Sequence, residues 1–304
     1  ALAQARQSEA RWQRGEPQGL LDGVPVTIKE NIATQGDPTP LGTAAVPLVP
    51  AAADAPPAAR LREAGAVMVA KTTMPDYGML SSGLSSFHPL SRNPWDVSKG
   101  PGGSSAGAGA AAAAGYGPLH IGTDIGGSLR LPASWCGIFS LKPSLGRIPI
   151  DPPYTGRAAG PMTRTVQDAA LMMQVLSQPD VRDSMSLPYQ PIAWGEYDQS
   201  VQRLRGLRLG LLLDAGCGLP VEAEVRAAVE HAARLFEQAG AQVSLMQPFM
   251  TQAMLDGMDH FWRMRSYTDL QALPEAQRAK VLPYIRAWAE SAAGMTGPQV
   301  FQAS

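Results

Sequence analysis

Cysteine is scarce in this sequence, whose 304 residues include only Cys136 and Cys217. The two form no Cys-x-x-Cys pair and no cluster with histidine, which argues against a disulfide framework and a structural zinc site. The four histidines also lack the spacing of metal ligands. Gly107-Ala108-Gly109 matches half of a dinucleotide fingerprint, but no acidic residue follows a second strand at the required distance. We therefore expect no metal and no cofactor.

Charge of one sign and long apolar runs are lacking as well. The chain has 25 basic and 26 acidic residues, so no basic field attracts nucleic acid or anionic lipid. No apolar run reaches 18 residues, and the longest candidate, residues 107–115, consists of Ala and Gly. The first 15 residues are polar and contain no signal-peptide core. With 45% hydrophobic residues, the sequence indicates a folded, core-rich, cytoplasmic protein without nucleic-acid or membrane partners.

Short β-branched runs alternate with helical segments along the first 180 residues, an order typical of α/β layering. We expect strands at residues 24–28, 66–70 and 118–123, and helices at residues 1–14, 56–64, 106–115 and 165–176. The helix at 106–115 contains only Ala and Gly, so it must lie very close to other backbone. Residues 82–105 have dense turn formers and no periodicity, which indicates a loop.

The later part of the chain predicts a strand–helix–strand unit at about residues 207–246. Leu207–Leu213 has the pattern of a strand, Val221–Gln238 that of an amphipathic helix, and Gln242–Leu245 that of a second strand. Such a βαβ unit follows the right-handed crossover rule. Residues 178–200 are rich in Pro and Asp, which indicates a linker or a surface excursion.

Two glycine–serine segments could carry chemistry. Residues 103–107 match G-x-S-x-G, with Ser105 as the nucleophile of a strand-to-helix elbow, but residues 95–101 contain proline and glycine and cannot form the preceding strand. The alternative is a turn whose serines cap the Ala-rich helix. Residues 122–130 place Ser128 after two glycines, which let several backbone amides point at one spot, as in an oxyanion hole.

Lys29 adjoins the apolar run of residues 24–28. It lies either at the exposed end of a strand or in a buried position, where desolvation disfavours the charged ammonium. A neutral lysine can act as a base on a serine hydroxyl. The position of Lys29, taken by itself, leaves both interpretations open.

Together, these segments resemble the amidase signature family. The resemblance rests on GVPVTIKENI, GPGGSSAGAGAAAAAG, GTDIGGSLRLPASWCGIFSLKPSLGRIP and GPMTRTVQDAA, which follow one another between about residue 19 and residue 180. Ser104 lies 24 positions before Ser128, as the family pattern requires. The departures are small, because Glu30 replaces a common Asp and Ala106 a common Gly.

The resemblance implies a role for each matched residue. Ser128 corresponds to the acylated nucleophile, Lys29 to the base, and Ser104 to the bridging serine, which the family holds with a cis peptide bond. The oxyanion hole corresponds to the backbone amides of Ile125, Gly126, Gly127 and Ser128. Four further residues would bind substrate or brace the loop, namely Ser105, Thr123, Asp124 and Arg130.

The resemblance also implies a fold and an activity. The fold would be α/β, with a mixed central β-sheet flanked by helices in a single amidase domain over residues 1–304 that is shorter than the family at both ends. The reaction would be hydrolysis of a small-molecule carboxamide to a carboxylate and ammonia or an amine through an acyl-Ser128 intermediate. The alternatives are a glutaminase-type component of an amidotransferase complex and a non-catalytic binding module, and a homodimer stays open.

Residues outside these motifs carry weaker expectations. His88, in the long loop, could line a substrate entrance, whereas we expect His120 in the core and Cys136 packed as a small hydrophobe. Five aromatic residues could wall a substrate pocket or belong to the core, namely Tyr77, Phe87, Trp95, Tyr154 and Trp262.

Overall fold

The computed structural model describes residues 1–195 and 201–303, which form two compact units. The first unit contains residues 1–195 and 273–285, and the second contains the described residues of 196–272 and 286–304. The last five residues of the segment expected to be a linker, 196–200, lie outside the described residues.

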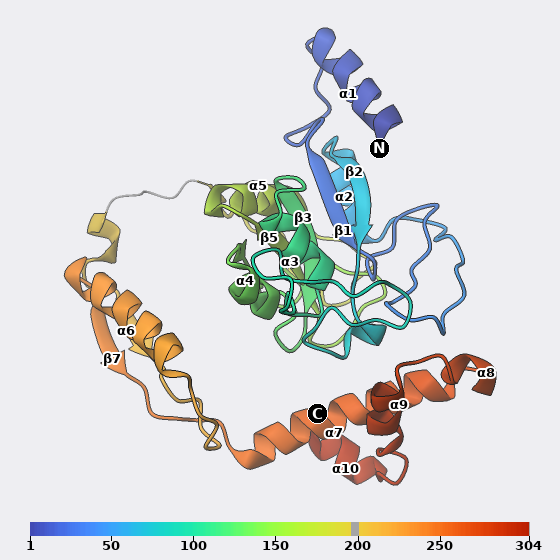
Figure 1. Ribbon diagram of the computed structural model, residues 1–304. Helices are drawn as coiled ribbons and strands as arrows, with labels where there is room; N and C mark the ends of the chain where they lie inside the picture. Colours follow the sequence, from blue (N-terminus) through green and yellow to red (C-terminus); the bar gives the residue numbers. More distant parts are fainter. Residues whose placement is uncertain (196–200, 304) are drawn as a thin grey trace. The chain divides into compact units, whose positions relative to one another are not determined.

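A five-stranded mixed sheet forms the centre of the first unit (Figure 1). Its strands are β1 Pro25–Lys29, β2 Val67–Thr72, β3 Leu119–Asp124, β4 Phe139–Ser140 and β5 Ala158–Thr163, in the spatial order β2-β1-β3-β5-β4. β1 runs parallel to β2 and β3, whereas β5 runs antiparallel to β3 and β4. The predicted mixed central sheet is therefore confirmed.

Burial along the strands agrees with this order. All six residues of β3 and all six of β5 are buried, as interior strands of a covered sheet require. β2 lies at the edge of the sheet and exposes Val69 and Ala70. The interior strands β3 and β5 therefore fix the position of the turn that follows β3.

Helices cover both faces of the sheet. The first unit contains α1 Leu2–Gln13, α2 Pro56–Glu63, the short 3₁₀ helix η1 Asp76–Gly78, α3 Ala106–Ala113, α4 Arg130–Cys136 and α5 Val166–Leu176. Ala159 of β5 belongs to the core cluster that includes Leu61 of α2 and Met173 of α5. Met162 belongs to a separate cluster with Ala108 of α3. Since side chains alternate along a strand, the two clusters lie on opposite faces.

The small-residue helix α3 lies against other backbone, as its composition predicts. A Cβ atom added to Gly107 would lie 2.4 Å from the backbone nitrogen of Thr73, and one added to Gly109 would lie 2.9 Å from Cβ of Pro132. The close approach holds the serines that precede α3 beside the ends of β2 and β3.

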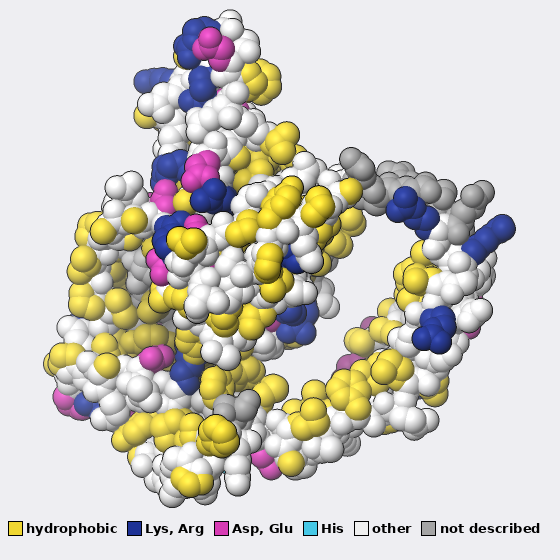
Figure 2. Space-filling view, turned by 180° about the vertical axis from the view of Figure 1, so that it is seen from behind, with side chains coloured by type: hydrophobic (Ala, Val, Ile, Leu, Met, Phe, Trp, Pro, Cys, Tyr) yellow, Lys and Arg dark blue, Asp and Glu magenta, His cyan; other side chains and the backbone are white. Residues whose placement is uncertain are grey.

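The second unit contains the predicted strand–helix–strand unit. β6 Arg208–Leu211 and β7 Gln242–Leu245 form a parallel pair joined through α6 Ala223–Gln238. No residue of α6 is buried, and hydrophobic side chains stand on the surface of this part of the chain (Figure 2). The other helices of the second unit are η2 Val201–Leu204, α7 Gln252–Gln271 and α10 Gly297–Ala303. By residue number, α8 Glu275–Arg278 belongs to the first unit, and α9 Pro283–Glu290 has residues in both units. No described helix has both the length and the apolar character needed to cross a membrane.

Candidate active site

Three separate segments meet at the carboxyl ends of β1 and β3. Lys29 is the last residue of β1, Ser104 and Ser105 precede α3, and residues 125–128 form the turn after β3. Because β1 and β3 are neighbouring parallel strands, their carboxyl ends share one edge of the sheet, where ligand sites of α/β sheets form.

Lys29 is fully buried and is surrounded by hydroxyl groups. Its Nζ lies 2.8 Å from Ser104 Oγ, 3.0 Å from Ser105 Oγ and 3.1 Å from Thr123 Oγ1, all within hydrogen-bond distance. The structure therefore places three predicted site residues, Ser104, Ser105 and Thr123, around the amine of a fourth, Lys29.

The protonation of this lysine is strongly perturbed. Burial, and after it the positive charge of Arg157, lowers the pKa of Lys29 from its usual 10.5 to about 7, although the carboxylates of Asp124 and Glu30 oppose the change. A pKa near 7 makes a substantial neutral fraction available at neutral pH, and a neutral amine is the form that can accept a proton.

Ser105 has a different surrounding from Ser104. Its hydroxyl donates to the backbone oxygen of Thr123 at 3.2 Å and accepts from the backbone nitrogen of Thr123 at 3.3 Å. Ser105 occupies the N-cap position of α3, but its side chain makes no capping hydrogen bond, so the expected capping by serine side chains is not observed. The hydroxyl of Ser105 instead joins α3 to β3.

Ser104 follows a cis peptide bond after Gly103, as the resemblance implies. Its side chain is buried, and a Cβ atom on Gly103 would lie only 2.5 Å from the backbone nitrogen of Ser82. Ser128 is partly exposed, and its backbone oxygen accepts from the backbone nitrogen of Ser105 at 3.2 Å. Within the described residues the hydroxyl of Ser128 has no hydrogen bond to Ser104, so the two serine segments are joined through backbone.

Asp124 braces the turn that carries Ser128. Its carboxylate accepts from the backbone nitrogens of Gly127 at 2.8 Å and Leu129 at 3.0 Å, and it pairs with the guanidinium of Arg130 at 2.9 and 3.0 Å. Burial alone would raise the pKa of Asp124, but the Arg130 guanidinium and the two backbone donors outweigh burial and hold it below its usual value. The loop therefore depends on an ionised carboxylate.

The four predicted oxyanion donors differ in availability. The backbone nitrogen of Gly127 already donates to Asp124. The backbone nitrogens of Ile125, Gly126 and Ser128 donate to no acceptor among the described residues. Three amides at the end of β3 are thus free to receive an anionic oxygen, and Gly127 shapes the turn with a φ of +116°.

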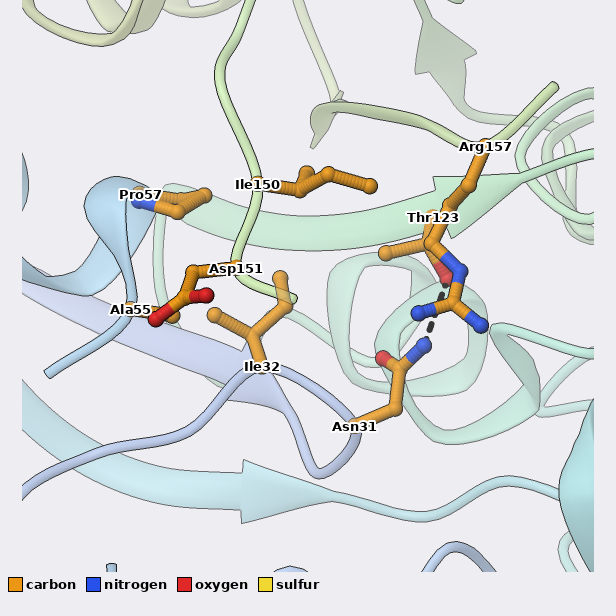
Figure 3. Close-up of a pocket in the computed structure, with 8 residues that line it drawn as sticks. All are labelled: Asn31, Ile32, Ala55, Pro57, Thr123, Ile150, Asp151 and Arg157. Atoms are coloured by element: carbon orange, nitrogen blue, oxygen red, sulfur yellow. Dashed lines mark hydrogen bonds between the residues drawn. The ribbon is translucent and has the colours of Figure 1, made fainter. Parts of the chain in front are cut away.

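A pocket beside Lys29 adds residues that sequence reasoning missed. It is lined by Asn31, Ile32, Ala55, Pro57, Thr123, Ile150, Asp151 and Arg157 (Figure 3). Asn31 Nδ2 donates to Thr123 Oγ1 at 3.0 Å, while Asn31 Oδ1 is buried without a hydrogen-bond partner among the described residues. Asn31 stands two residues after Lys29 and could have been found from that position, whereas only the strand register brings Arg157 to the site.

His120 and Cys136 take structural positions, and His88 contacts a buried carboxylate. His120 is buried, with its Nδ1 2.8 Å from Thr27 Oγ1, and burial lowers its pKa, so the expected core position is confirmed. Cys136 is buried, and burial raises the pKa of its thiol to about 11. His88 Nε2 lies 2.7 Å from Oε2 of the buried Glu30, which also accepts from a backbone nitrogen. The described residues include no group of three potential metal ligands.

Comparisons with known proteins agree with this geometry. The Amidase family profile matches residues 1–285. A glutamyl-tRNA(Gln) amidotransferase subunit from Alkaliphilus metalliredigens (strain QYMF) is 38% identical over 251 residues, which is 80% of this chain and 50% of the relative. The corresponding protein from Anaeromyxobacter sp. (strain K) is 40% identical over 243 residues, covering 77% of this chain and 49% of the relative.

Solved structures show the same fold. A bacterial aryl acylamidase of the amidase signature family superimposes with a TM-score of 0.88 at 31% identity, over 99% of this chain and 65% of that chain. A peptide amidase in complex with the competitive inhibitor chymostatin gives a TM-score of 0.81 at 26% identity, over 99% of this chain and 68% of that chain. The chain spans about half the length of the curated relatives it matches. On its sequence, fold and arrangement of motifs, the chain belongs to the amidase signature family.

Proposed function

We propose that this chain is a serine amidohydrolase that cleaves a linear carboxamide, with Ser128 as nucleophile, Ser104 as proton relay and Lys29 as base. The observation that carries the proposal is the fully buried Lys29, whose amine lies 2.8 Å from Ser104 Oγ beside a glycine turn with unoccupied amides. A buried lysine with a pKa of about 7 is suited to general base catalysis near neutral pH.

The first half of the reaction forms an acyl-enzyme. Neutral Lys29 accepts the proton of Ser104, which takes the proton of Ser128 as Ser128 Oγ attacks the amide carbonyl carbon. The carbonyl oxygen becomes an oxyanion that receives hydrogen bonds from the amides of Ile125, Gly126 and Ser128. Collapse of the tetrahedral intermediate breaks the carbon–nitrogen bond, and the proton returns through Ser104 to the leaving nitrogen.

The second half restores the enzyme. Water attacks the acyl-Ser128 ester, and its proton passes to Lys29 through Ser104. The ester bond then breaks as this proton returns through Ser104 to Ser128 Oγ, which releases the carboxylic acid and leaves Lys29 neutral. The sum is amide plus water giving a carboxylic acid and ammonia or an amine. Loss of one oxyanion donor in such a site costs about 2.7–4 kcal/mol of transition-state stabilisation.

Three variants test the assignment. We expect Ser128→Ala to abolish both turnover and labelling by a fluorophosphonate probe, because the attacking oxygen is gone. Ser104→Ala and Lys29→Met should keep the fold and lower kcat by about 10²–10⁴-fold, because the proton has no path. Ser134→Ala, at an exposed position on α4, is the matched control and should keep wild-type turnover.

The readout is a panel of aryl, aliphatic and peptide amides combined with mass-spectrometric trapping of the acyl-enzyme. An adduct on a peptide containing Ser128 supports the proposal. Wild-type turnover by Ser128→Ala would overturn the choice of nucleophile. A wild-type chain that neither turns over any amide nor reacts with the probe would favour a non-catalytic binding module.

A second candidate function is the glutaminase-type component of an amidotransferase complex. It is favoured by the relatives of 35–40% identity, which belong to glutamyl-tRNA(Gln) amidotransferases. This candidate predicts ammonia release from glutamine only when a partner protein is present. Turnover of simple carboxamides by the chain without a partner favours the free-standing amidase.

A further inference from the structure

The strand register brings Arg157 to the turn that carries the nucleophile. β3 and β5 are antiparallel, and Asp124, the last residue of β3, pairs with Ala158, the first residue of β5. Ile125 and Arg157 are the next residues beyond this pair on the two segments. The neighbouring Gly156 agrees with this placement, because a Cβ atom on it would lie 3.6 Å from Ile125 Cγ2.

Local contacts fix the side chain of Arg157. Its backbone nitrogen donates to the backbone oxygen of Tyr154 at 3.0 Å, which closes a turn. Its guanidinium carbon lies 4.3 Å from the centre of the Tyr154 ring, a cation–π distance. Figure 3 shows the guanidinium directed toward Asn31 and Thr123 in the pocket. The cation therefore has a defined position.

One hydroxyl lies between this pocket and the base. Thr123 lines the pocket with Arg157, and its Oγ1 lies 3.0 Å from Asn31 Nδ2 and 3.1 Å from Lys29 Nζ. A guanidinium remains charged at every pH at which proteins are studied. Lys29 is fully buried, whereas Arg157 is partly exposed to solvent, so the positive charge of Arg157 makes the lysine the group that gives up its charge.

The other charged groups around Lys29 act in the opposite direction. Asp124, at the end of β3, and Glu30, the next residue after β1, both favour the protonated lysine. Each is already engaged, Asp124 with the Arg130 guanidinium and Glu30 with His88 Nε2.

Two further elements lie next to the base. On β2, Lys71 directs its Nζ to the backbone oxygen of Ile32 and to Thr34 Oγ1. The start of α3 contains no titratable side chain. Arg157 is thus the cation that acts on Lys29 from the β5 side.

We propose that Arg157 is a positioning residue that keeps Lys29 in its neutral, proton-accepting form. The inference rests on the proposed function of Lys29 as the base. Arg157 acts through its charge and does not itself move a proton. Arg157 also lines the pocket, where its charge suits an anionic substrate group, and the experiment separates that role from the proposed one.

The test compares Arg157→Gln and Arg157→Lys with wild type in the pH dependence of kcat/KM. The acid limb of the profile is the range in which activity falls as Lys29 becomes protonated. We expect Arg157→Gln to move this limb to higher pH by up to about one unit, which is up to about tenfold less activity near pH 7. Activity well above the limb should match wild type, because Lys29 is then neutral in both proteins. Arg157→Lys keeps the positive charge and should therefore keep the acid limb at its wild-type pH.

Arg164→Gln is the matched control. Arg164 is exposed and follows β5, about 20 Å along the strand from Arg157, so its removal should leave the limb in place. An unmoved limb in Arg157→Gln overturns the inference. An equal loss of kcat/KM at all pH values overturns it as well. A rise in KM confined to anionic amides, with the limb unmoved, also overturns it and would make Arg157 a substrate-binding residue.

A direct titration separates this inference from the proposed function. Lysine labelled with ¹³C at Cε reports the ionisation of Lys29 by NMR in the full chain, whether or not the chain is active, and Lys29→Met identifies the signal. Arg157→Gln should raise the measured pKa of Lys29. If Ser128→Ala keeps turnover while Arg157→Gln raises the pKa of Lys29, the proposed nucleophile is wrong and the electrostatic role of Arg157 stands.

Discussion

Replacing Lys29 with methionine should change how the stability of the fold depends on pH. The side chain is fully buried, and its pKa is lowered from 10.5 to about 7 when the chain folds. Between these two values the unfolded chain binds more protons than the folded chain. The free energy of unfolding therefore rises with pH across this window, and the destabilising effect of Lys29 is complete below about pH 7 and absent above about pH 10.5.

The magnitude follows from the same two values. A lowering from 10.5 to about 7 corresponds to about 5 kcal/mol, at about 1.4 kcal/mol for each pH unit. Methionine removes this cost but also removes the three contacts to Ser104, Ser105 and Thr123, each worth about 0.5–1.5 kcal/mol. The net effect at pH 7 is therefore a stabilisation by methionine of about 0.5–3.5 kcal/mol, and the decisive signal is its dependence on pH. Between pH 7 and pH 9 the wild type should gain about 2 kcal/mol relative to Lys29→Met.

Urea denaturation followed by circular dichroism at a series of pH values measures this difference. Lys99→Met, at an exposed position in the long loop, is the control and should show the pH profile of the wild type. If wild type and Lys29→Met keep a constant difference in unfolding free energy from pH 7 to pH 9, Lys29 does not change its protonation on folding. The interpretation of Lys29 as a neutral base would then be refuted.

Two further changes probe the loop and the packing of α3. Asp124→Asn removes the charge that pairs with Arg130 and one acceptor of the turn, so we expect kcat to fall by about 10²–10³-fold and the fold to lose about 1.5–3 kcal/mol of stability, and unchanged steady-state kinetics would contradict the bracing role. Gly107→Ala places a Cβ atom 2.4 Å from the backbone nitrogen of Thr73 and should destabilise the fold by about 1–3 kcal/mol in thermal unfolding. Gly100→Ala meets nothing within 4 Å and should change stability by less than about 0.5 kcal/mol.

Local sequence signals predict the elements that precede the site. The sequence predicts strands at residues 24–28 and 118–123, and the structure has β1 at Pro25–Lys29 and β3 at Leu119–Asp124. Both have apolar, β-branched residues bounded by turn formers, so their periodicity is visible in a short window. The helix predicted at residues 106–115 is confirmed as well, since α3 runs from Ala106 to Ala113. Its composition of Ala and Gly alone indicates the close packing against other segments.

β5 could not be predicted in the same way. Its sequence AAGPMT contains a glycine and a proline, which argue against an interior strand. Pro161 has no N–H to donate but still takes part in the sheet through its carbonyl, which accepts from the Leu141 nitrogen at 3.3 Å and from Ser140 Oγ at 2.9 Å. The position of Arg157 follows from the register of β5. Because the sequence does not predict β5, it does not predict Arg157 as a site residue either.

Two independent observations support Ser104, rather than its neighbours, as the proposed partner of the proposed base. The spacing of 24 residues to Ser128 singles it out in the sequence. In the structure, Lys29 Nζ lies within hydrogen-bond distance of three hydroxyl groups, and a neutral amine has one lone pair with which it can accept a proton from one of them. Ser105 cannot supply that proton, because its hydrogen is directed to Thr123 O, and Ser104 makes a shorter contact than Thr123, 2.8 Å against 3.1 Å. In the proposed mechanism, the neutral state that burial and Arg157 favour is the state in which Lys29 can accept a proton, and Ser104 is the nearest hydroxyl to supply it, so tuning of the base and choice of the relay depend on the same arrangement.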